Sequence, residues 1–376
     1  MNKTLITGLF VYPGKVGGAE IYFNNLLAGF LRNKSEDQIH LLLNRNLIDQ
    51  YDPIVNQFSI DFIDVKQNRV LYDSTLPFIH SPIKKFPVVF SPNYVTTLAN
   101  LTGSRSYVTT IHDLQYQHFP QFFSAKKRKW QYFAHINTLK ACKKVICISE
   151  FVRDDICKVY GEKYRDKLEV IHNPIDFSKL DKPAKGGKFA YDFPYVLSVA
   201  AHYPHKNTLS LVKAFNIFNK EFPQYKLVLV GQLSKNLVGG DYASYGAELG
   251  KAFESNPNII TTGFVKDDEL AQIYRNCSFF VFPSLFEGFG MPPVEAMGVG
   301  KPVITTRCGS LQEVTLNKAM YINTPQDEWE IAEHMLNCHK NLPAKSLQAE
   351  KLSEEIRHTY CPGNVSRAYT HVFDKL

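Results

Sequence analysis

Short apolar runs alternate with longer amphipathic stretches along almost the whole chain. Such runs are typical of strands buried on both faces of a parallel sheet, and the stretches between them are long enough for helices. We therefore predict an α/β protein built from parallel sheets. The predicted strands are 5–10, 39–43, 87–90, 107–111, 145–149 and 168–171 in the first half, and 195–199, 226–230, 258–262, 279–282 and 302–306 in the second.

One segment interrupts this alternation. Residues 179–194 are rich in Lys, Gly and Pro and have no periodicity, which is typical of a linker. A chain of 376 residues fits two domains. We place them at 1–180 and 181–359, with a C-terminal helix at about 360–376 that packs back on the first domain. We also predict helices over 19–31, 125–142 and 364–374, and a polar loop over 233–245.

Charge is unevenly divided between the two halves. The net charge is +7, and residues 1–180 carry 23 Lys and Arg against 16 Asp and Glu, whereas 181–376 carry 20 of each. A basic first half favours an anionic partner such as lipid headgroups, a pyrophosphate-linked acceptor or nucleic acid. The basic run Lys126–Lys129 lies among aromatic residues and indicates an anionic membrane surface, or alternatively a helix with a solvated basic face. Nucleic acid fits less well because no recognition motif accompanies the charge.

The cysteines and the apolar runs indicate where the protein works. Seven cysteines are scattered without a CxxC pair or a Cys/His cluster at metal spacing, which favours reduced thiols. The apolar N-terminal run is interrupted at Pro13–Lys15, so we interpret it as the first strand and not as a signal peptide. No run approaches the ~20 residues that span a bilayer. We expect a cytoplasmic protein, peripheral at the inner membrane.

The segment EGFGMPPVEAM, at 287–297, carries the most specific chemistry. It follows an apolar run and holds Glu287 and Glu295, eight positions apart, with glycines and a proline pair between them. This pattern predicts a strand, a glycine loop and a helix that begins near the prolines. Backbone N–H groups at a helix start bind phosphate, and the carboxylates accept hydrogen bonds from hydroxyls. The patch favours a nucleotide sugar; the alternative is a buried strand–helix corner with two solvated glutamates.

Three further segments follow predicted strands, at the edge where parallel sheets bind ligands. Gly17 and Gly18 form a turn whose N–H groups can approach phosphate, and a plain strand–helix turn explains them equally well. His112 can bond a sugar hydroxyl or polarise a leaving group; the alternative is a structural histidine beside a helix-capping Asp113. Lys206 can neutralise a diphosphate, although a lysine in a loop is usually only solvated.

Together these segments resemble the retaining glycosyltransferases of family 4, whose GT-B fold has two Rossmann-like parallel-sheet domains facing a central cleft. The resemblance covers nearly the whole chain, and the Glu287–Glu295 spacing is its most specific element. The other motifs fall in the family's order: GGAE at 17–20, HDL at 112–114, CISEF at 147–151, HNPID at 172–176, HKN at 205–207, TGF at 262–264, and KPVITT to GSLQEV at 300–314.

The resemblance implies a role for each matching residue. Glu295 would bind the ribose hydroxyls, and Lys206 the diphosphate. Glu287 would hold the hydroxyls of the donor sugar, with N–H groups around Gly288, Phe289 and Gly290. The first domain would be on the acceptor side. Its Gly17 and Gly18 would close over the phosphates or the acceptor, and its His112 would lie near the transferred sugar. The second domain would bind the nucleotide sugar, with Phe264 beside the base.

One position departs from the family pattern. Ala201 stands where the family commonly has an arginine, five positions before the lysine. Diphosphate binding would then depend on Lys206, with His202, His205 or a helix dipole as further partners.

The resemblance implies a retaining, metal-independent hexosyltransferase without a cofactor. Its donor would be a GDP- or UDP-sugar, and HDLQ followed by FPQFF, at 112–123, favours GDP-mannose because it is similar to mannosyltransferase-type members. The acceptor would be a glycan or lipid-linked glycan of lipopolysaccharide or another surface polysaccharide. The alternatives are a non-catalytic nucleotide-sugar-binding scaffold, which Ala201 favours, a GT-B epimerase, and a phosphorylase, which would need pyridoxal phosphate.

Overall fold

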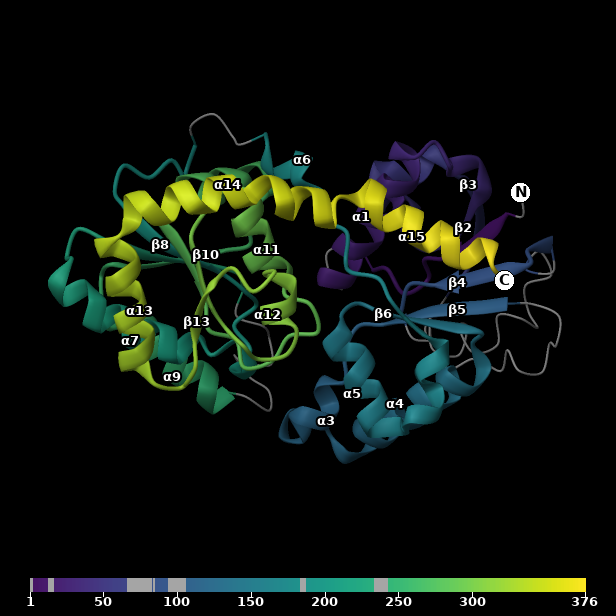
Figure 1. Cartoon of the computed structure of the whole chain (residues 1–376), viewed down its shortest axis with the longest axis horizontal. Coiled ribbons are helices and arrows are strands. Elements are labelled where there is room, and N and C mark those ends of the chain that lie inside the picture. The colour runs from purple at the N-terminus through teal and green to yellow at the C-terminus, as the bar shows by residue number, and fades with distance from the viewer. Residues whose placement is uncertain are drawn as a thin grey trace. The chain divides into compact units, whose positions relative to one another are not determined.

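The computed structural model describes residues 3–12, 17–65, 83, 85–93, 106–182, 187–232 and 243–376. It divides the chain into two compact units: a first unit of Met1–Ile175 with Tyr360–Leu376, and a second unit of Asp176–Thr359 (Figure 1). Each unit contains a parallel sheet flanked by helices, so the predicted α/β class is confirmed.

The sheet of the first unit has the strand order β3-β2-β1-β4-β5-β6-β7 among the described residues. The order reverses between β1 and β4, and the carboxyl ends of two such strands border a crevice in which parallel sheets bind ligands. The sequence did not predict β3, whose five residues are at most half-buried at the sheet edge. The strands are β1 Thr4–Thr7, β2 Ile39–Asn44, β3 Ser59–Ile63, β4 Val88–Ser91, β5 Ser106–Ile111, β6 Lys144–Cys147 and β7 Leu168–Val170.

The C-terminal helix α15 (Pro362–Asp374) packs against α1 (Gly18–Arg32), as the yellow and purple ribbons show (Figure 1). A Cβ at Gly29 of α1 would lie 2.2 Å from the carbonyl oxygen of Pro362, so only glycine allows this close approach. The Tyr22 hydroxyl lies 2.6 Å from that of Tyr369. The chain end therefore completes the core of the first unit.

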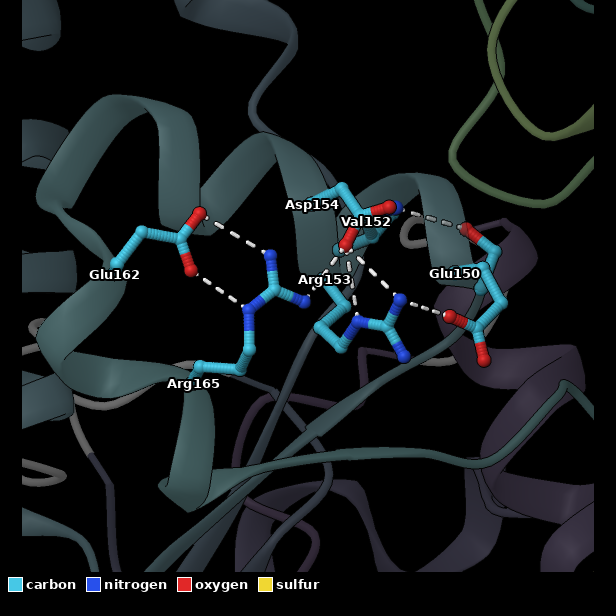
Figure 2. Close-up of polar contacts among 7 residues, drawn as sticks. Glu150, Val152, Arg153, Asp154, Glu162 and Arg165 are labelled. Atoms are coloured by element: carbon cyan, nitrogen blue, oxygen red, sulfur yellow. Dashed lines mark hydrogen bonds and ion pairs between the residues drawn. The ribbon is translucent and has the colours of Figure 1, made fainter.

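The CISEF motif has a structural role at the start of α5 (Glu150–Tyr160). The Ser149 hydroxyl accepts a hydrogen bond from the Val152 N–H at 3.1 Å and so caps the helix. Figure 2 shows the surface network that follows, in which Arg153 and Arg165 both donate to Asp154 Oδ1. Exposed ion pairs of this kind contribute little because solvent screens them, so they stabilise the α5 surface only modestly.

The other helices of the first unit lie between the strands in sequence. The predicted helix over 125–142 is found as α4 (Ala125–Ala141), and a short α3 (Gln115–His118) precedes it. No helix in the described part of the chain is long and apolar enough to cross a bilayer.

The sheet of the second unit has the order β10-β9-β8-β11-β12-β13 in the described residues. Its order reverses between β8 and β11, which pair directly. The strands are β8 Tyr195–Val199, β9 Lys226–Val230, β10 Ile259–Gly263, β11 Phe279–Phe282, β12 Val303–Thr306 and β13 Met320–Ile322. The helices are α6 Phe177–Leu180, α7 Thr208–Glu221, α9 Ala243–Glu254, α10 Asp267–Asn276, α11 Met291–Gly298, α12 Leu311–Val314, α13 Glu328–Lys340 and α14 Leu342–Tyr360.

The second unit begins at Asp176, a few residues before the predicted boundary at 180. Helix α6 (Phe177–Leu180) explains the difference, because it packs against α10 of this unit and the carbonyl oxygen of Leu180 accepts a hydrogen bond from Arg275 Nε at 2.6 Å. Of the predicted linker, residues 183–186 lie outside the described residues. Residues 233–242 of the predicted loop 233–245 also lie outside the described residues, and residues 243–245 form the start of helix α9 instead of a loop.

Candidate functional site

Lys206 and Glu287 meet at the carboxyl edge of the second sheet. Lys206 follows β8 and Glu287 follows β11, the two neighbouring strands at which the strand order reverses. Lys206 Nζ lies 2.6 Å from Glu287 Oε1. The two candidate residues therefore lie together at the position where open parallel sheets bind ligands.

Hydrogen bonds join the loops that carry these two side chains. The carbonyl oxygen of His205 accepts from the Leu285 N–H at 2.7 Å and from the Ser284 hydroxyl at 3.1 Å. Asn207 adopts a left-handed conformation, with φ of 58°, and its amide donates to the carbonyl oxygen of Pro283 at 3.2 Å. The loop after β8 is thus fixed to the loop after β11.

The backbone of Glu287 is held from the other side by the loop after β12. Ser310 donates to the Glu287 carbonyl oxygen through its N–H at 3.1 Å and its hydroxyl at 3.2 Å, and the hydroxyl also lies 2.8 Å from the Phe289 carbonyl oxygen. A Cβ at Gly309, where φ is 63°, would lie 2.3 Å from that Glu287 oxygen. Only glycine therefore fits at position 309.

The Lys206–Glu287 pair is largely withdrawn from solvent, with side chains 18 % and 11 % exposed. Lys206 Nζ also lies 5.6 Å from the centre of the Phe282 ring, which adds a cation–π contact. Each member of such a pair can exchange its partner for a polar group of a ligand without being left unpaired. The ammonium can bind a phosphate, and the carboxylate can accept from a hydroxyl.

The predicted loop and helix follow Glu287. Gly290, with φ of 89°, precedes α11, which begins at Met291 and carries Pro292 and Pro293 in its first turn. Prolines have no N–H, so the N–H groups at this helix start are those of Gly290 and Met291. Two backbone donors thus lie three and four residues after the carboxylate of Glu287.

Glu295 lies in α11, and its Oε2 accepts a hydrogen bond from the Tyr274 hydroxyl of α10 at 2.8 Å. Burial raises the pKa of Glu295 to about 6. The Glu295 residue as a whole is half-buried, and the side chain of Glu287 is 11 % exposed. The alternative of two solvated glutamates is therefore wrong. Tyr274 is a neighbour that the sequence analysis missed, because a tyrosine on the apolar face of a helix looks like any core residue.

His202 and His205 do not supply the positive charge that Ala201 lacks. Burial lowers the pKa of His202 to about 4 and that of His205 to about 3, so both imidazoles are neutral at pH 7. Ala201 itself is exposed. The expectation that these histidines add positive charge beside a diphosphate is thus wrong. Lys206 is the cation of this loop.

Phe264 directly follows β10 at the same edge of the second sheet, and its residue is 75 % exposed. An aromatic ring in this position offers a free face for stacking. That Phe264 stacks on a nucleotide base stays a prediction.

His112 of the first unit follows β5 and lies beside the end of β4. Its Nε2 lies 2.9 Å from the carbonyl oxygen of Pro92, and the Tyr22 ring packs edge-on at 5.0 Å. Burial lowers the pKa of His112, so the ring is neutral. Because a carbonyl only accepts, Nε2 carries the hydrogen and Nδ1 is left as an acceptor. Asp113 makes the expected local contact, accepting from the Gln115 N–H at 2.9 Å.

Gly17 and Gly18 form the start of α1. Gly17 is the residue before the helix, with φ of 53°, and a Cβ there would meet nothing within 4 Å. Residues 13–16 lie outside the described residues, so the turn is seen only from Gly17 onward. The contact of this turn with phosphate stays a prediction.

Sequence comparisons extend over both units. Residues 16–179 match the family described as Glycosyltransferase Family 4, and residues 182–357 match the family described as Glycosyl transferases group 1. The O-antigen chain mannosyltransferase RfbU of Salmonella typhimurium is 31 % identical over 242 residues, which are 63 % of this chain and 62 % of that protein. The O-antigen chain mannosyltransferase B of Escherichia coli is 27 % identical over 61 % of this chain and 60 % of its own length. The chain thus spans less than two thirds of these relatives.

Solved structures match the whole chain. HepE of Anabaena in complex with UDP-glucose has a TM-score of 0.76 at 18 % identity, with 100 % of each chain covered. Sucrose-phosphate synthase of Thermosynechococcus elongatus has a TM-score of 0.75 at 18 % identity, covering 100 % of this chain and 99 % of that one. At this identity the likeness concerns the fold alone, and it confirms the predicted GT-B fold.

Proposed function

We propose that this chain, which belongs to the family 4 glycosyltransferases, moves a hexose from a nucleotide sugar to a glycan or lipid-linked glycan acceptor. The observation that carries the proposal is the Lys206–Glu287 pair at the reversal point of the second sheet. One cation and one hydroxyl acceptor at that point suit the diphosphate and the sugar of one donor. Glu295, eight residues further on, would then accept from the ribose hydroxyls.

The charges at the site suggest how the reaction proceeds. Departure of a nucleoside diphosphate builds negative charge, which Lys206 and the N–H groups of Gly290 and Met291 would stabilise without a metal ion. The acceptor hydroxyl would attack the anomeric carbon from the side of the leaving phosphate. Its proton would pass to the departing phosphate oxygen, so configuration is retained without a protein nucleophile. Neutral His112 would accept a hydrogen bond from a sugar hydroxyl through Nδ1.

We propose GDP-mannose as the donor and a surface polysaccharide of the O-antigen type as the product. The names of the relatives support this choice, since both similar proteins from Salmonella typhimurium and Escherichia coli are O-antigen chain mannosyltransferases. The solved HepE complex contains UDP-glucose, so UDP-sugars are the donors to test beside GDP-mannose.

An acceptor carried by a lipid would bring the enzyme to the cytoplasmic membrane face. Helix α4 supports this, because Lys126, Lys129, Trp130 and Phe133 are all exposed and share one helical face by their spacing. Phe133 is 61 % exposed, and aromatic rings beside lysines bind anionic lipid surfaces. Sedimentation with vesicles tests this: anionic vesicles should bind the protein and neutral ones should not, and K126E/K129E should abolish binding.

The main experiment measures sugar transfer from GDP-mannose and UDP-glucose to an acceptor glycan in buffer with EDTA. Lys206→Ala and Glu287→Ala should lose transfer by at least a hundredfold while remaining folded, whereas Lys213→Ala on α7 should keep it. NMR of the product would show a retained anomeric configuration. Wild-type turnover in both site variants would refute the assignment, and an inverted product would refute the route.

The competing proposal is a nucleotide-sugar-binding scaffold without activity, which the absence of an arginine at Ala201 favours. It predicts that the protein binds a nucleotide sugar but releases no nucleoside diphosphate with any acceptor. Release measured in the presence of an acceptor distinguishes the two, and interconversion of the sugar without an acceptor would indicate an epimerase.

A further inference from the structure

Tyr274 connects the apolar core of the second unit to the proposed donor site. Its side chain is completely buried, with 0 % exposed, in helix α10. Its hydroxyl lies 2.8 Å from Glu295 Oε2 and 3.4 Å from the carbonyl oxygen of Pro292, both in α11. The shorter distance and the negative charge favour the carboxylate as acceptor of its single hydrogen.

We propose that Tyr274 is a positioning residue, which fixes the Glu295 carboxylate so that it accepts from the 2′- and 3′-hydroxyls of a ribose. The enzyme would then select ribonucleotide donors over 2′-deoxyribonucleotide donors. This inference rests on the proposed function, in which Glu295 is the ribose acceptor.

Geometry gives Tyr274 this role. A carboxylate has about four lone-pair sites. The bond from Tyr274 occupies one of them on Oε2, which leaves Oε1 and the remaining site on Oε2 for the two hydroxyls of the diol. The tyrosine ring packs 5.8 Å from the Phe280 ring of β11 and does not reach solvent, so the anchor itself is rigid. An anchored carboxylate binds its ligand without first losing rotational freedom.

The protonation states suit this arrangement. Burial raises the pKa of Tyr274 well above 10, so its hydroxyl remains a donor at any working pH. Burial also raises the pKa of Glu295, while the bond from Tyr274 opposes that rise. The other groups that act on this pair are Asp267, which raises the pKa of Glu295 and pairs with Lys179 at 3.5 Å, and the Cys277 thiol beside Tyr274.

The experiment compares the binding of GDP and UDP with that of their 2′-deoxy forms by calorimetry, from pH 5 to 8. The wild type should bind the ribose forms more tightly and should lose this preference as pH falls through about 6, when Glu295 takes up a proton. Tyr274→Phe should weaken the ribose forms about tenfold, leave the deoxy forms nearly unchanged, and move the pH midpoint upward.

Tyr195→Phe is the matched control. The Tyr195 hydroxyl donates to the carbonyl oxygen of Ile273 at 2.7 Å, so this variant also loses a buried bond to helix α10 but leaves Glu295 untouched. It should keep the ribose preference and the pH midpoint. Equal losses in Tyr195→Phe and Tyr274→Phe would show a merely structural effect and overturn the inference.

Glu295→Gln separates this inference from the proposed function. It should lose the pH dependence and most of the ribose preference. If Glu295→Gln keeps the full preference, the ribose role of Glu295 in the proposed function is refuted, and the inference with it. If Glu295→Gln loses the preference and Tyr274→Phe keeps both the preference and the midpoint, only the inference is overturned.

Discussion

Lys206 Nζ and Glu287 Oε1 lie 2.6 Å apart although the two residues are separated by 81 positions in the sequence. The strand order explains this, since β8 and β11 are neighbours while β9 and β10 lie on the far side of β8. Because parallel strands end at one edge of the sheet, the first residues after β8 and β11 are brought together. Lys206, the proposed cation for a diphosphate, and Glu287, the proposed acceptor for a sugar hydroxyl, therefore already form an ion pair with each other.

Removing either member of this pair should destabilise the second unit. Lys206→Ala leaves a largely buried carboxylate without its cation, and we expect a loss of about 1–3 kcal/mol in the free energy of unfolding. The double variant K206A/E287A should lose less than the sum of the single losses, because no charge is then left unpaired. Urea unfolding of the four proteins measures this coupling, and additive losses would contradict it.

Glu295→Gln should stabilise the protein at alkaline pH. The pKa of Glu295 is about 6 in the folded state, against an ordinary value of 4.5. A raised carboxyl pKa contributes stability that is complete below pH 4.5 and is lost as pH rises through 6. The uncharged glutamine avoids that loss, so we expect a gain of about 1–2 kcal/mol at pH 8 and almost none at pH 4.5. Urea unfolding at both pH values tests this. The prediction is refuted if the free energy of unfolding differs between Glu295→Gln and the wild type by the same amount at pH 8 and at pH 4.5.

Gly309→Ala should abolish donor binding. The new Cβ would lie 2.3 Å from the Glu287 carbonyl oxygen, so the loop that carries Glu287 must move. Gly187→Ala is the control, because Gly187 also has a positive φ, of 96°, but open space around its Cβ position. It should cost about 1–2 kcal/mol of stability through backbone strain and leave binding intact. Calorimetry with GDP and UDP measures binding, and similar losses in both variants would contradict the proposed contact.

Ala201→Arg should strengthen the binding of nucleoside diphosphates. Ala201 is exposed, and it stands where the family commonly has arginine. A guanidinium at this position would add a second cation to Lys206, and we expect about three- to tenfold tighter binding that declines with added salt. Unchanged affinity at low salt would show that position 201 does not reach the diphosphate.

Most of the sheet architecture follows from the sequence because buried parallel strands are nearly uniform apolar runs. The runs at 195–199, 226–230 and 279–282 are strands with those same bounds. The strands missed are β3 and β13. Both lie at sheet edges, where no residue of β3 is fully buried and β13 has only three residues, so neither forms a long apolar run.

The candidate site could be predicted only in part. Glu287, Glu295 and Lys206 can be recognised in the sequence because charged residues that follow apolar strands are candidates for ligand binding. Ser310, which holds the Glu287 backbone, and Tyr274, which bonds Glu295, could not be found in this way. Their roles depend on tertiary contacts between segments that are distant in sequence, and neither residue type is unusual where it stands.

The position of α15 affects how this chain is synthesised. Val365, Tyr369 and Phe373 belong to the core that also holds Tyr22 and Phe30, yet the ribosome makes the whole second unit before it reaches them. At about 5–20 residues per second, the nascent first unit waits roughly 10–40 s with one side of α1 uncovered. The first unit therefore cannot complete its core until the last segment of the chain has been made, although its own first residues were translated earliest.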